Sequence, residues 1–417
     1  MSTTTSRTDA AYVWVWLPGA SAPVVAGRLV RAGNRVAFVY GRSYLARPDA
    51  IALYLPELPL RDGRVEPLGD LSIAGCLADA GPDSWGQRVI EARHGINRVT
   101  DPLRELDALT YLVESGTDRI GGLDFQLSPT QYVPRTSRAT LAELQEAAAA
   151  LEDGRELPAA LGDALVHGTS IGGARPKALI EHGSRSWIAK FSSTGDRLPM
   201  VRWEALGMSL ARRVGLEVAG TRLTRSLDKD VLLVERFDRP GGGRRRLMVS
   251  ALTMLGLHEM TGRYATYPAL ADVIRERFSR PDATLRELFA RIVLNIAVTN
   301  SDDHARNHAA FWDGRTLTLT PAYDVSPQAR AGTEVNLAMA IGRDGQRTAQ
   351  FGHAIAAAGV FHLSEQEARD IVAAQVQVIH EQWDEACDEA RLTHVQRTAL
   401  WGRQVLHPWA SLPPDRA

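Results

Sequence analysis

The feature that most constrains this chain is an apolar helix followed at once by a dense polar loop. Residues 284–297 carry apolar side chains at helical spacing, and such a stripe has to face a core. The loop that follows contains Asp302 and, five residues later, Asn307. A third polar residue, Asp324, comes after the alternating apolar run 316–321, which indicates a hairpin. We therefore expect a packed helix and a hairpin that present these three side chains to a cleft.

The three residues match the parts that phosphoryl transfer requires, in the required order. One carboxylate orients the attacking hydroxyl and accepts its proton, while an amide oxygen and a second carboxylate hold magnesium against the phosphates. Asp302, Asn307 and Asp324 fit these roles in turn. One alternative is that the residues only cap a helix and satisfy a polar loop. A second alternative is a two-metal hydrolase built on Asp302, Asp303, His304 and His308.

The composition is that of a globular protein long enough for two or more domains. The chain has 417 residues, and its net charge of −1 gives no indication of nucleic-acid or membrane binding by this chain alone. Its two cysteines, Cys76 and Cys387, are far apart in sequence, which fits buried thiols in a reducing compartment better than a disulfide framework. No stretch is long and apolar enough to span a bilayer, and residues 1–9 lack the order of a signal peptide. We expect a cytoplasmic protein without a membrane partner.

The first folded region combines strands and helices and ends at the polar, proline-containing stretch 128–137. Runs of β-branched and aromatic residues bounded by glycine and proline predict the strands. The expected strands are 13–17, 36–40 and 123–125, and the expected helices follow Pro82 as far as Ala92 and cover 102–113. This pattern predicts an N-terminal α+β subdomain at 11–127.

A second domain is expected at 138–240 and a mainly helical third one at 241–417. The second contains helices at 140–152 and 200–214, a Gly-rich loop at 168–174, and strands at 177–181, 187–191 and 231–234. In the third, a helix is expected over 364–386, because Ser364 followed by Glu367 is the signature of a capping box.

The upstream half favours phosphoryl transfer over hydrolysis. Lys190 lies in a short apolar strand, where its charge needs water or a partner, and in a kinase such a lysine pairs with the α- and β-phosphates. Glycines in the preceding loop allow backbone N–H groups to approach phosphate oxygens. Glu204, on the next helix, is a candidate partner for Lys190, and the strand end at 235–237 resembles a hinge that contacts adenine. A snorkelling lysine and an exposed helix charge are the alternatives.

Six motifs in a fixed order carry a resemblance to a known family. They are Pro-Glu-Leu-Pro-Leu at 56–60, Gly-Pro-Asp-Ser-Trp-Gly at 81–86, Ser-Ile-Gly-Gly-Ala-Arg-Pro-Lys at 170–177, Val-Glu-Arg-Phe-Asp-Arg at 234–239, Asp-Asp-His-Ala-Arg-Asn-His at 302–308 and Pro-Ala-Tyr-Asp at 321–324. Together they resemble the HipA toxin kinases over nearly the whole chain. Each motif alone is unspecific, whereas the ordered set is highly specific.

The resemblance implies the α+β class, with a bilobed protein-kinase-like fold, an N-terminal α+β subdomain and a mainly helical C-terminal lobe. It implies that Asp302 is the catalytic base, that Asn307 and Asp324 bind Mg²⁺, and that Ser170 is an autophosphorylation site. The residues that it implies for ATP contacts are Gly172, Gly173, Ala174, Arg175, Pro176, Lys177, Lys190, Glu235, Arg236, Phe237, His304 and Asn307.

The resemblance also implies a role as the toxin of a toxin–antitoxin pair. Its partner would be a small HipB-like helix-turn-helix antitoxin, and the chain would reach DNA only through this partner. Its substrate would be a host protein such as an aminoacyl-tRNA synthetase. Asp303 and Arg306 replace a glycine and a lysine of the best-known member, which leaves the required ligands intact but puts the protein substrate in doubt. A small-molecule kinase and a catalytically silent co-repressor are the alternatives. The N-terminal region argues against the first, and the intact catalytic set argues against the second.

Overall fold

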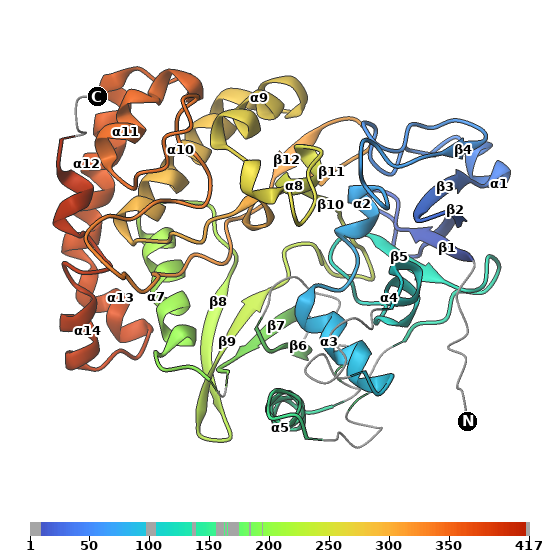
Figure 1. Cartoon of the computed structure of the whole chain (residues 1–417), viewed down its shortest axis with the longest axis horizontal. Coiled ribbons are helices and arrows are strands. Elements are labelled where there is room, and N and C mark those ends of the chain that lie inside the picture. Colours follow the sequence, from blue (N-terminus) through green and yellow to red (C-terminus); the bar gives the residue numbers. More distant parts are fainter. Residues whose placement is uncertain are drawn as a thin grey trace.

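The computed structural model describes residues 10–96, 106–135, 139–155, 162, 165, 175–182, 185–193 and 195–413. In this part of the chain the strands form three sheets, and helices dominate the C-terminal part. Figure 1 shows the N-terminal strands at one end of the molecule and the C-terminal helices at the other, with the strands of 177–235 between them. Among the described residues, no helix has the length and apolar character needed to cross a membrane.

The N-terminal region is built on a five-stranded antiparallel sheet. Its strands are β1 Ala10–Val15, β2 Val24–Ala32, β3 Arg35–Tyr40, β4 Arg64–Val65 and β5 Leu123–Gln126. They lie in the order β4-β3-β2-β1-β5, so the last strand of the region pairs with the first. The predicted strands at 13–17, 36–40 and 123–125 are therefore confirmed to within three residues at each end.

Four helices accompany this sheet: α1 Arg42–Leu45, α2 Gly75–Ala78, α3 Ser84–Arg93 and α4 Ala108–Glu114. The helix predicted after Pro82 is α3. The helix predicted at 102–113 begins later than expected, because the Asp107 carboxylate accepts the N–H groups of Leu109 and Thr110 and so caps α4. Residues 102–105 of that prediction lie outside the described residues.

A four-stranded antiparallel sheet forms the middle of the molecule. Its strands are β6 Lys177–His182, β7 Arg185–Phe191, β8 Thr221–Ser226 and β9 Lys229–Glu235, in the order β6-β7-β9-β8. Two helices flank it, α5 Leu141–Glu152 and α7 Met200–Arg213. All were predicted, apart from β8. The sheet shares a buried cluster with α3 of the N-terminal region, where Trp85 joins Ala189 and Phe191.

The C-terminal part combines a small sheet with many helices. The strands β10 Leu247–Ser250, β11 Ala309–Trp312 and β12 Leu317–Leu319 form an antiparallel sheet. The α-helices are α8 Ala251–Met254, α9 Tyr267–Arg277, α10 Pro281–Ala297, α11 Phe351–Ala356, α12 Glu365–Glu381, α13 Trp383–Glu389 and α14 His394–Leu400. Short 3-10 turns are η1 Gly262–Tyr264, η2 Ala305–Asn307, η3 Ala358–Phe361 and η4 Pro408–Ser411.

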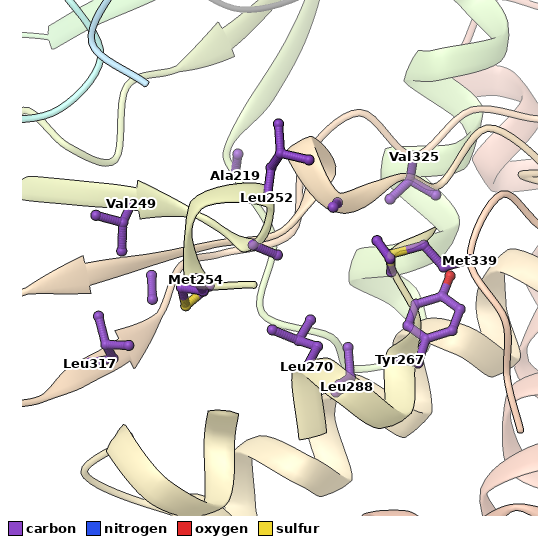
Figure 2. Packing of buried hydrophobic residues seen from close by; sticks show 14 of the residues in the cluster. Ala219, Val249, Leu252, Met254, Tyr267, Leu270, Leu288, Leu317, Val325 and Met339 are labelled. Carbon is purple, nitrogen blue, oxygen red and sulfur yellow. The ribbon is translucent and has the colours of Figure 1, made fainter. Parts of the chain in front are cut away.

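Helix α10 is the central support of this part, as its apolar stripe predicted. Its buried residues pack with those of α8, α9 and the segment after β12 in one cluster. Figure 2 shows Leu270 of α9 and Leu288 of α10 in this cluster, together with Met254, Val325 and Met339. The polar loop 298–308 leaves the end of this packed helix, so its position is held by the core.

The helix predicted at 364–386 is two helices, which corrects that prediction. The capping box of Ser364 and Glu367 starts α12 as expected, but α12 stops at Glu381 and α13 restarts at Trp383. No glycine or proline marks the break in the sequence. Tertiary contacts fix it instead, because Gln382 accepts a hydrogen bond from Arg213 at 2.8 Å and the ring centroid of Trp383 lies 4.9 Å from that of Trp401.

Candidate active site

Hydrogen bonds within the loop fix the position of Asp302. The side-chain amide of Asn300 donates to the Asn295 side chain at 2.9 Å, and its backbone N–H donates to the Asn295 carbonyl at 2.8 Å. Thr299, with a φ of 54°, turns the chain in the left-handed region. At the other end, the Asn307 amide nitrogen donates to the Asp302 carbonyl at 3.3 Å. This bond uses the amide nitrogen of Asn307, so the amide oxygen is the side-chain atom that could ligate a metal ion.

Asp303 and His308 stabilise the loop from inside the core. The Asp303 carboxylate is buried and accepts hydrogen bonds from the Tyr267 hydroxyl at 2.5 Å and from His308 Nε2 at 2.8 Å. No group of three or more metal-ligating side chains lies together among the described residues. The engagement of Asp303 and His308 with each other argues against the two-metal hydrolase, which required both as ligands.

Asp302 is exposed at the surface of the loop, next to the buried Asp303. Neighbouring protein atoms nevertheless shield its carboxyl group in part from water, which raises the pKa of Asp302; His304 opposes that rise, and the nearby carboxylates of Asp324 and Asp303 reinforce it. A carboxylate whose pKa is raised is a better acceptor for a proton from a hydroxyl. Because the Asp324 carboxylate contributes to the raised pKa of Asp302, the two carboxylates lie close enough for their charges to interact. The exposure of Asp302 and its raised pKa are compatible with the catalytic role that was predicted for it.

Lys190 joins the sheet to the helical part through two carboxylates. Its Nζ lies 2.6 Å from Glu204 Oε1 of α7 and 2.5 Å from Asp324 Oδ1. β7 is flanked by β6 and β9, so Lys190 is not an edge lysine that snorkels to water. Burial lowers the pKa of Lys190, but Asp324 and Glu204 outweigh burial and raise it above its usual value. The ion pair with Glu204, left open by the sequence, is present.

Asp324 is placed by an unusual backbone and a close helix contact. Its φ of 61° lies in the left-handed region, which aspartate tolerates better than most residues. The next residue, Val325, passes so close to α7 that a Cβ added at Gly207 would lie 2.2 Å from the Val325 carbonyl oxygen. Since α7 also carries Glu204, this helix fixes both carboxylates that hold Lys190. The Lys190 ammonium lowers the pKa of Asp324 and keeps it ionised.

The predicted hinge residues 235–237 contact the sheet through their backbone and two aromatic rings through Phe237. The backbone N–H groups of Glu235 and Arg236 donate to the carbonyls of Gly220 and Ser186 at 2.7 and 2.9 Å, so they serve the sheet rather than a ligand. The Phe237 ring lies 5.9 Å from Phe311 and 5.7 Å from Tyr323 between ring centroids. The backbone N–H groups of Glu235 and Arg236 are therefore not available for the adenine contact that was predicted for this hinge.

The Arg236 side chain belongs to a buried ion network that the sequence did not reveal. Its Nε and Nη2 lie 2.7 Å from the two oxygens of Asp238, and Nη2 also donates to the Arg119 carbonyl at 2.7 Å. Asp238 accepts the Gly121 N–H at 2.8 Å, and Arg239 reaches Asp118 at 2.7 Å. Burial raises the pKa of Asp238, but Arg236 and Arg239 outweigh it and lower the pKa. The network joins the hinge to the N-terminal region.

The remaining predicted residues that the structure describes lie on or next to β6. Lys177 is the cross-strand partner of Lys190 and lies 3.0 Å from Asp83 of the N-terminal region. Arg175 forms a two-fold ion pair with Asp196, and the Pro176 carbonyl accepts the Phe191 N–H at 3.0 Å. Ser170, Gly172, Gly173 and Ala174 lie outside the described residues. The contacts of Asp83, Arg119 and Tyr267 were missed, because no local sequence signal connects residues so far apart.

The donor set fits a magnesium–nucleotide complex. Asn307 and Asp324 offer amide and carboxylate oxygens, the hard ligands that Mg²⁺ prefers. Lys190 and Lys177 stand opposite each other on one face of the sheet and would supply positive charge for phosphates. An antiparallel sheet carries Lys190, which is paired with Glu204, and the helical part carries the loop from Asp302 to Asn307 and then Asp324. This arrangement places the chain in the bilobed protein-kinase-like fold class.

Comparison with protein families agrees. The model of the HipA-like C-terminal domain matches residues 169–383, and the model of the HipA N-terminal domain matches residues 15–126. The chain belongs to the HipA family.

Two curated relatives and one solved structure are similar to it. A putative kinase, Y4mE of Sinorhizobium fredii, is 28% identical over 37% of this chain and 38% of its own length. The serine/threonine-protein kinase toxin HipA of Shewanella oneidensis is 26% identical over 57% of this chain and 64% of its own length. The chain thus spans less than two thirds of either relative. HipA in the Shewanella oneidensis complex of HipA, HipB and operator DNA has a TM-score of 0.68 at 20% identity, covering 94% of this chain and 98% of that one, which shows the shared fold.

Proposed function

We propose that this protein is an ATP- and Mg²⁺-dependent serine/threonine protein kinase that acts as the toxin of a toxin–antitoxin pair. The observation that carries the proposal is Lys190, held at 2.6 and 2.5 Å by Glu204 and Asp324. Kinases need this lysine–glutamate pair and the metal-binding aspartate in place together. In this chain Glu204 and Asp324 both contact Lys190, which supports the proposal.

Each residue has a distinct role in the proposed reaction. Asp302 orients the substrate hydroxyl and accepts its proton as the hydroxyl oxygen attacks the γ-phosphorus and the bond to the departing ADP breaks. Asn307 and Asp324 would hold Mg²⁺, which when bound neutralises charge on the phosphate oxygens. Lys190 binds the α- and β-phosphates, and Glu204 keeps it oriented. The raised pKa of Asp302 suits it to accept the proton.

The nucleotide is proposed to lie between the two sides of the cleft. Its phosphates would meet the loop 172–177 and Lys190, and its adenine the hinge 235–237. His304 and Asn307 would complete the site from the polar loop 298–308. Supporting this placement, His304 acts on the charges of both Asp302 and Asp324.

The Asp302→Asn variant tests the enzymatic part of the proposal. Asparagine keeps the shape of the side chain but removes the base, so transfer from radiolabelled ATP should fall at least about 100-fold while ATP affinity stays near wild type. The matched control is Asp370→Asn, an exposed acid on α12, which should leave transfer unchanged. Wild-type transfer by Asp302→Asn would remove Asp302 from the mechanism.

The partner and substrate are also proposed. The similar Shewanella oneidensis protein is found with HipB and operator DNA, which supports a HipB-like helix-turn-helix antitoxin as partner here. Since the net charge is −1, the chain alone should give no tight, salt-sensitive complex in a gel shift with its operator. Tight binding without a partner would contradict this. Phosphoproteomics of host lysate treated with the protein would distinguish a translation-related target, such as an aminoacyl-tRNA synthetase, from a small-molecule substrate or a silent co-repressor.

Autophosphorylation of Ser170 is a proposed form of self-regulation. Ser170 belongs to the Gly-rich loop 168–174 and directly precedes Ile171, Gly172 and Gly173, so a phosphate there would add about two negative charges close to those of ATP. The modified loop should leave its nucleotide-binding conformation, and ATP affinity should fall. Mapping of phosphosites after incubation with Mg-ATP, followed by measurement of nucleotide affinity, tests this. An unmodified Ser170, or an unchanged affinity, would contradict it.

A further inference from the structure

The position of Lys177 is the starting point. In the antiparallel pair of β6 and β7, Lys177 lies directly opposite Lys190, so the two side chains share one face of the sheet. The Lys177 side chain is only 2% exposed. Its charge is close enough to Lys190 and Asp324 to interact with both. A second lysine therefore stands beside the one that is proposed to bind the α- and β-phosphates.

A buried ammonium needs a compensating charge, and Asp83 provides one. Oδ2 of Asp83 lies 3.0 Å from Lys177 Nζ, although the two residues are 94 positions apart. Without this carboxylate, burial and the repulsion of Lys190 would favour loss of the Lys177 proton. Arg306, in the catalytic loop, is the other charge that acts on Asp83.

Asp83 is itself held rigidly. Its other oxygen, Oδ1, accepts the Gly86 N–H at 2.9 Å and caps α3. α3 is anchored in turn, because Trp85, Val89 and Ile90 pack into the cluster that contains Phe191 of β7. The carboxylate that faces Lys177 thus comes from a helix of the N-terminal region that is packed directly onto the sheet of the nucleotide site.

We propose that Asp83 is a positioning residue for nucleotide binding, which holds the Lys177 ammonium beside Lys190 where both meet the phosphates. This inference rests on the proposed kinase function and extends it. The N-terminal region thereby completes the nucleotide site instead of lying beside it. A purely structural role for Asp83, as the cap of α3, is the competing explanation.

The Asp83→Asn substitution separates the two explanations. Asparagine caps a helix as well as aspartate does, so α3 should keep its stability while the charge opposite Lys177 is lost. Asp107→Asn is the matched control, because Asp107 caps α4 of the same region and forms its ion pair with Arg31 at 2.5 Å. Asp83→Ser, which also caps well, replaces Asp83→Asn if that variant does not fold.

The experiment is a double-mutant cycle of Mg-ATP affinity by calorimetry, with thermal unfolding measured on every variant. Asp83→Asn should weaken Mg-ATP binding roughly tenfold, while in a Lys177→Gln background the same change should have less than about a twofold effect. Asp107→Asn should bind like wild type. Equal affinity of wild type and Asp83→Asn, tighter binding by Asp83→Asn, or an undiminished effect in the Lys177→Gln background would overturn this inference alone. A wild-type protein that binds no Mg-ATP would overturn the proposed function as well.

Discussion

Replacing Lys190 by methionine should test the charge cluster at the centre of the site. Methionine keeps the length and packing of the side chain but removes the cation that contacts both Glu204 and Asp324. Removing one partner of a buried ion pair costs about 3–5 kcal/mol, because the other charge stays buried. The Glu204 side chain is only 11% exposed, so its charge would stay buried, whereas the Asp324 side chain is 41% exposed and its charge can be solvated. We therefore expect a loss at the lower end, about 3 kcal/mol of unfolding free energy at pH 7.

The same variant has a pH signature with a defined sign. In the wild type Lys190 lowers the pKa of Asp324, so this pair stabilises the fold above the unfolded pKa and the gain is lost as pH falls through the folded pKa. In Lys190→Met the two carboxylates repel each other. The folded pKa of Asp324 should then rise above its unfolded value, and that of Glu204, which burial already raises in the wild type, should rise further. The deficit relative to wild type should therefore be largest near pH 8 and shrink towards pH 5, because the carboxyl groups then take up protons.

Urea unfolding at several pH values measures both effects. Lys229→Met, an exposed lysine at the start of β9, is the control and should change stability by less than about 0.5 kcal/mol. The double variant Lys190→Met/Glu204→Gln should recover part of the loss, since the buried charge is removed too. A deficit below 1 kcal/mol at pH 7, or one that grows towards pH 5, would refute this account.

Three further changes probe the supports of the site. Asp324→Asn keeps a residue that tolerates the left-handed backbone but removes the carboxylate, so Mg-ATP binding measured by calorimetry should weaken about tenfold. Unchanged affinity and metal dependence would rule out the ligand role. Arg119→Met leaves the buried Asp124, 2.7 Å from the guanidinium, without its main partner, and should cost about 3 kcal/mol in urea unfolding; a loss below 1 kcal/mol would contradict the network. Gly207→Ala should force α7 away from the Val325 carbonyl and cost about 1–3 kcal/mol by the same method, with weaker nucleotide binding; wild-type behaviour would show that the contact is loose.

The sequence predicted the elements whose signals are local. The apolar stripe of α10 and the strand around Lys190 appear where expected. The charges of Asp302 and Asp324 interact, and the Asn307 side chain donates to the Asp302 carbonyl. The residue ranges 11–127, 138–240 and 241–417 stay a prediction. Periodicity and capping patterns report only on neighbours along the chain, and these neighbours define most helices and strands.

The parts that could not be predicted depend on distant partners. Asp83 and Lys177 are 94 residues apart, and the Arg236 guanidinium meets the Arg119 carbonyl across 117 residues. Neither contact leaves a spacing or a composition signal. The break between α12 and α13 is similar, because contacts with Arg213 and Trp401 impose it on a sequence that could continue as one helix.

The ion network at the hinge has a consequence for how the molecule unfolds. Chains of this length commonly melt domain by domain, in separate transitions. Here, detaching the N-terminal sheet would take the Gly121 N–H from Asp238 and the Arg119 carbonyl from Arg236, and would strip α3 from the sheet of Lys190. What remained would expose apolar surface and hold buried charges without partners, so it would have little stability of its own. The whole chain should therefore lose its structure in one cooperative step, and a protease that cuts between 128 and 137 should release no long-lived C-terminal fragment.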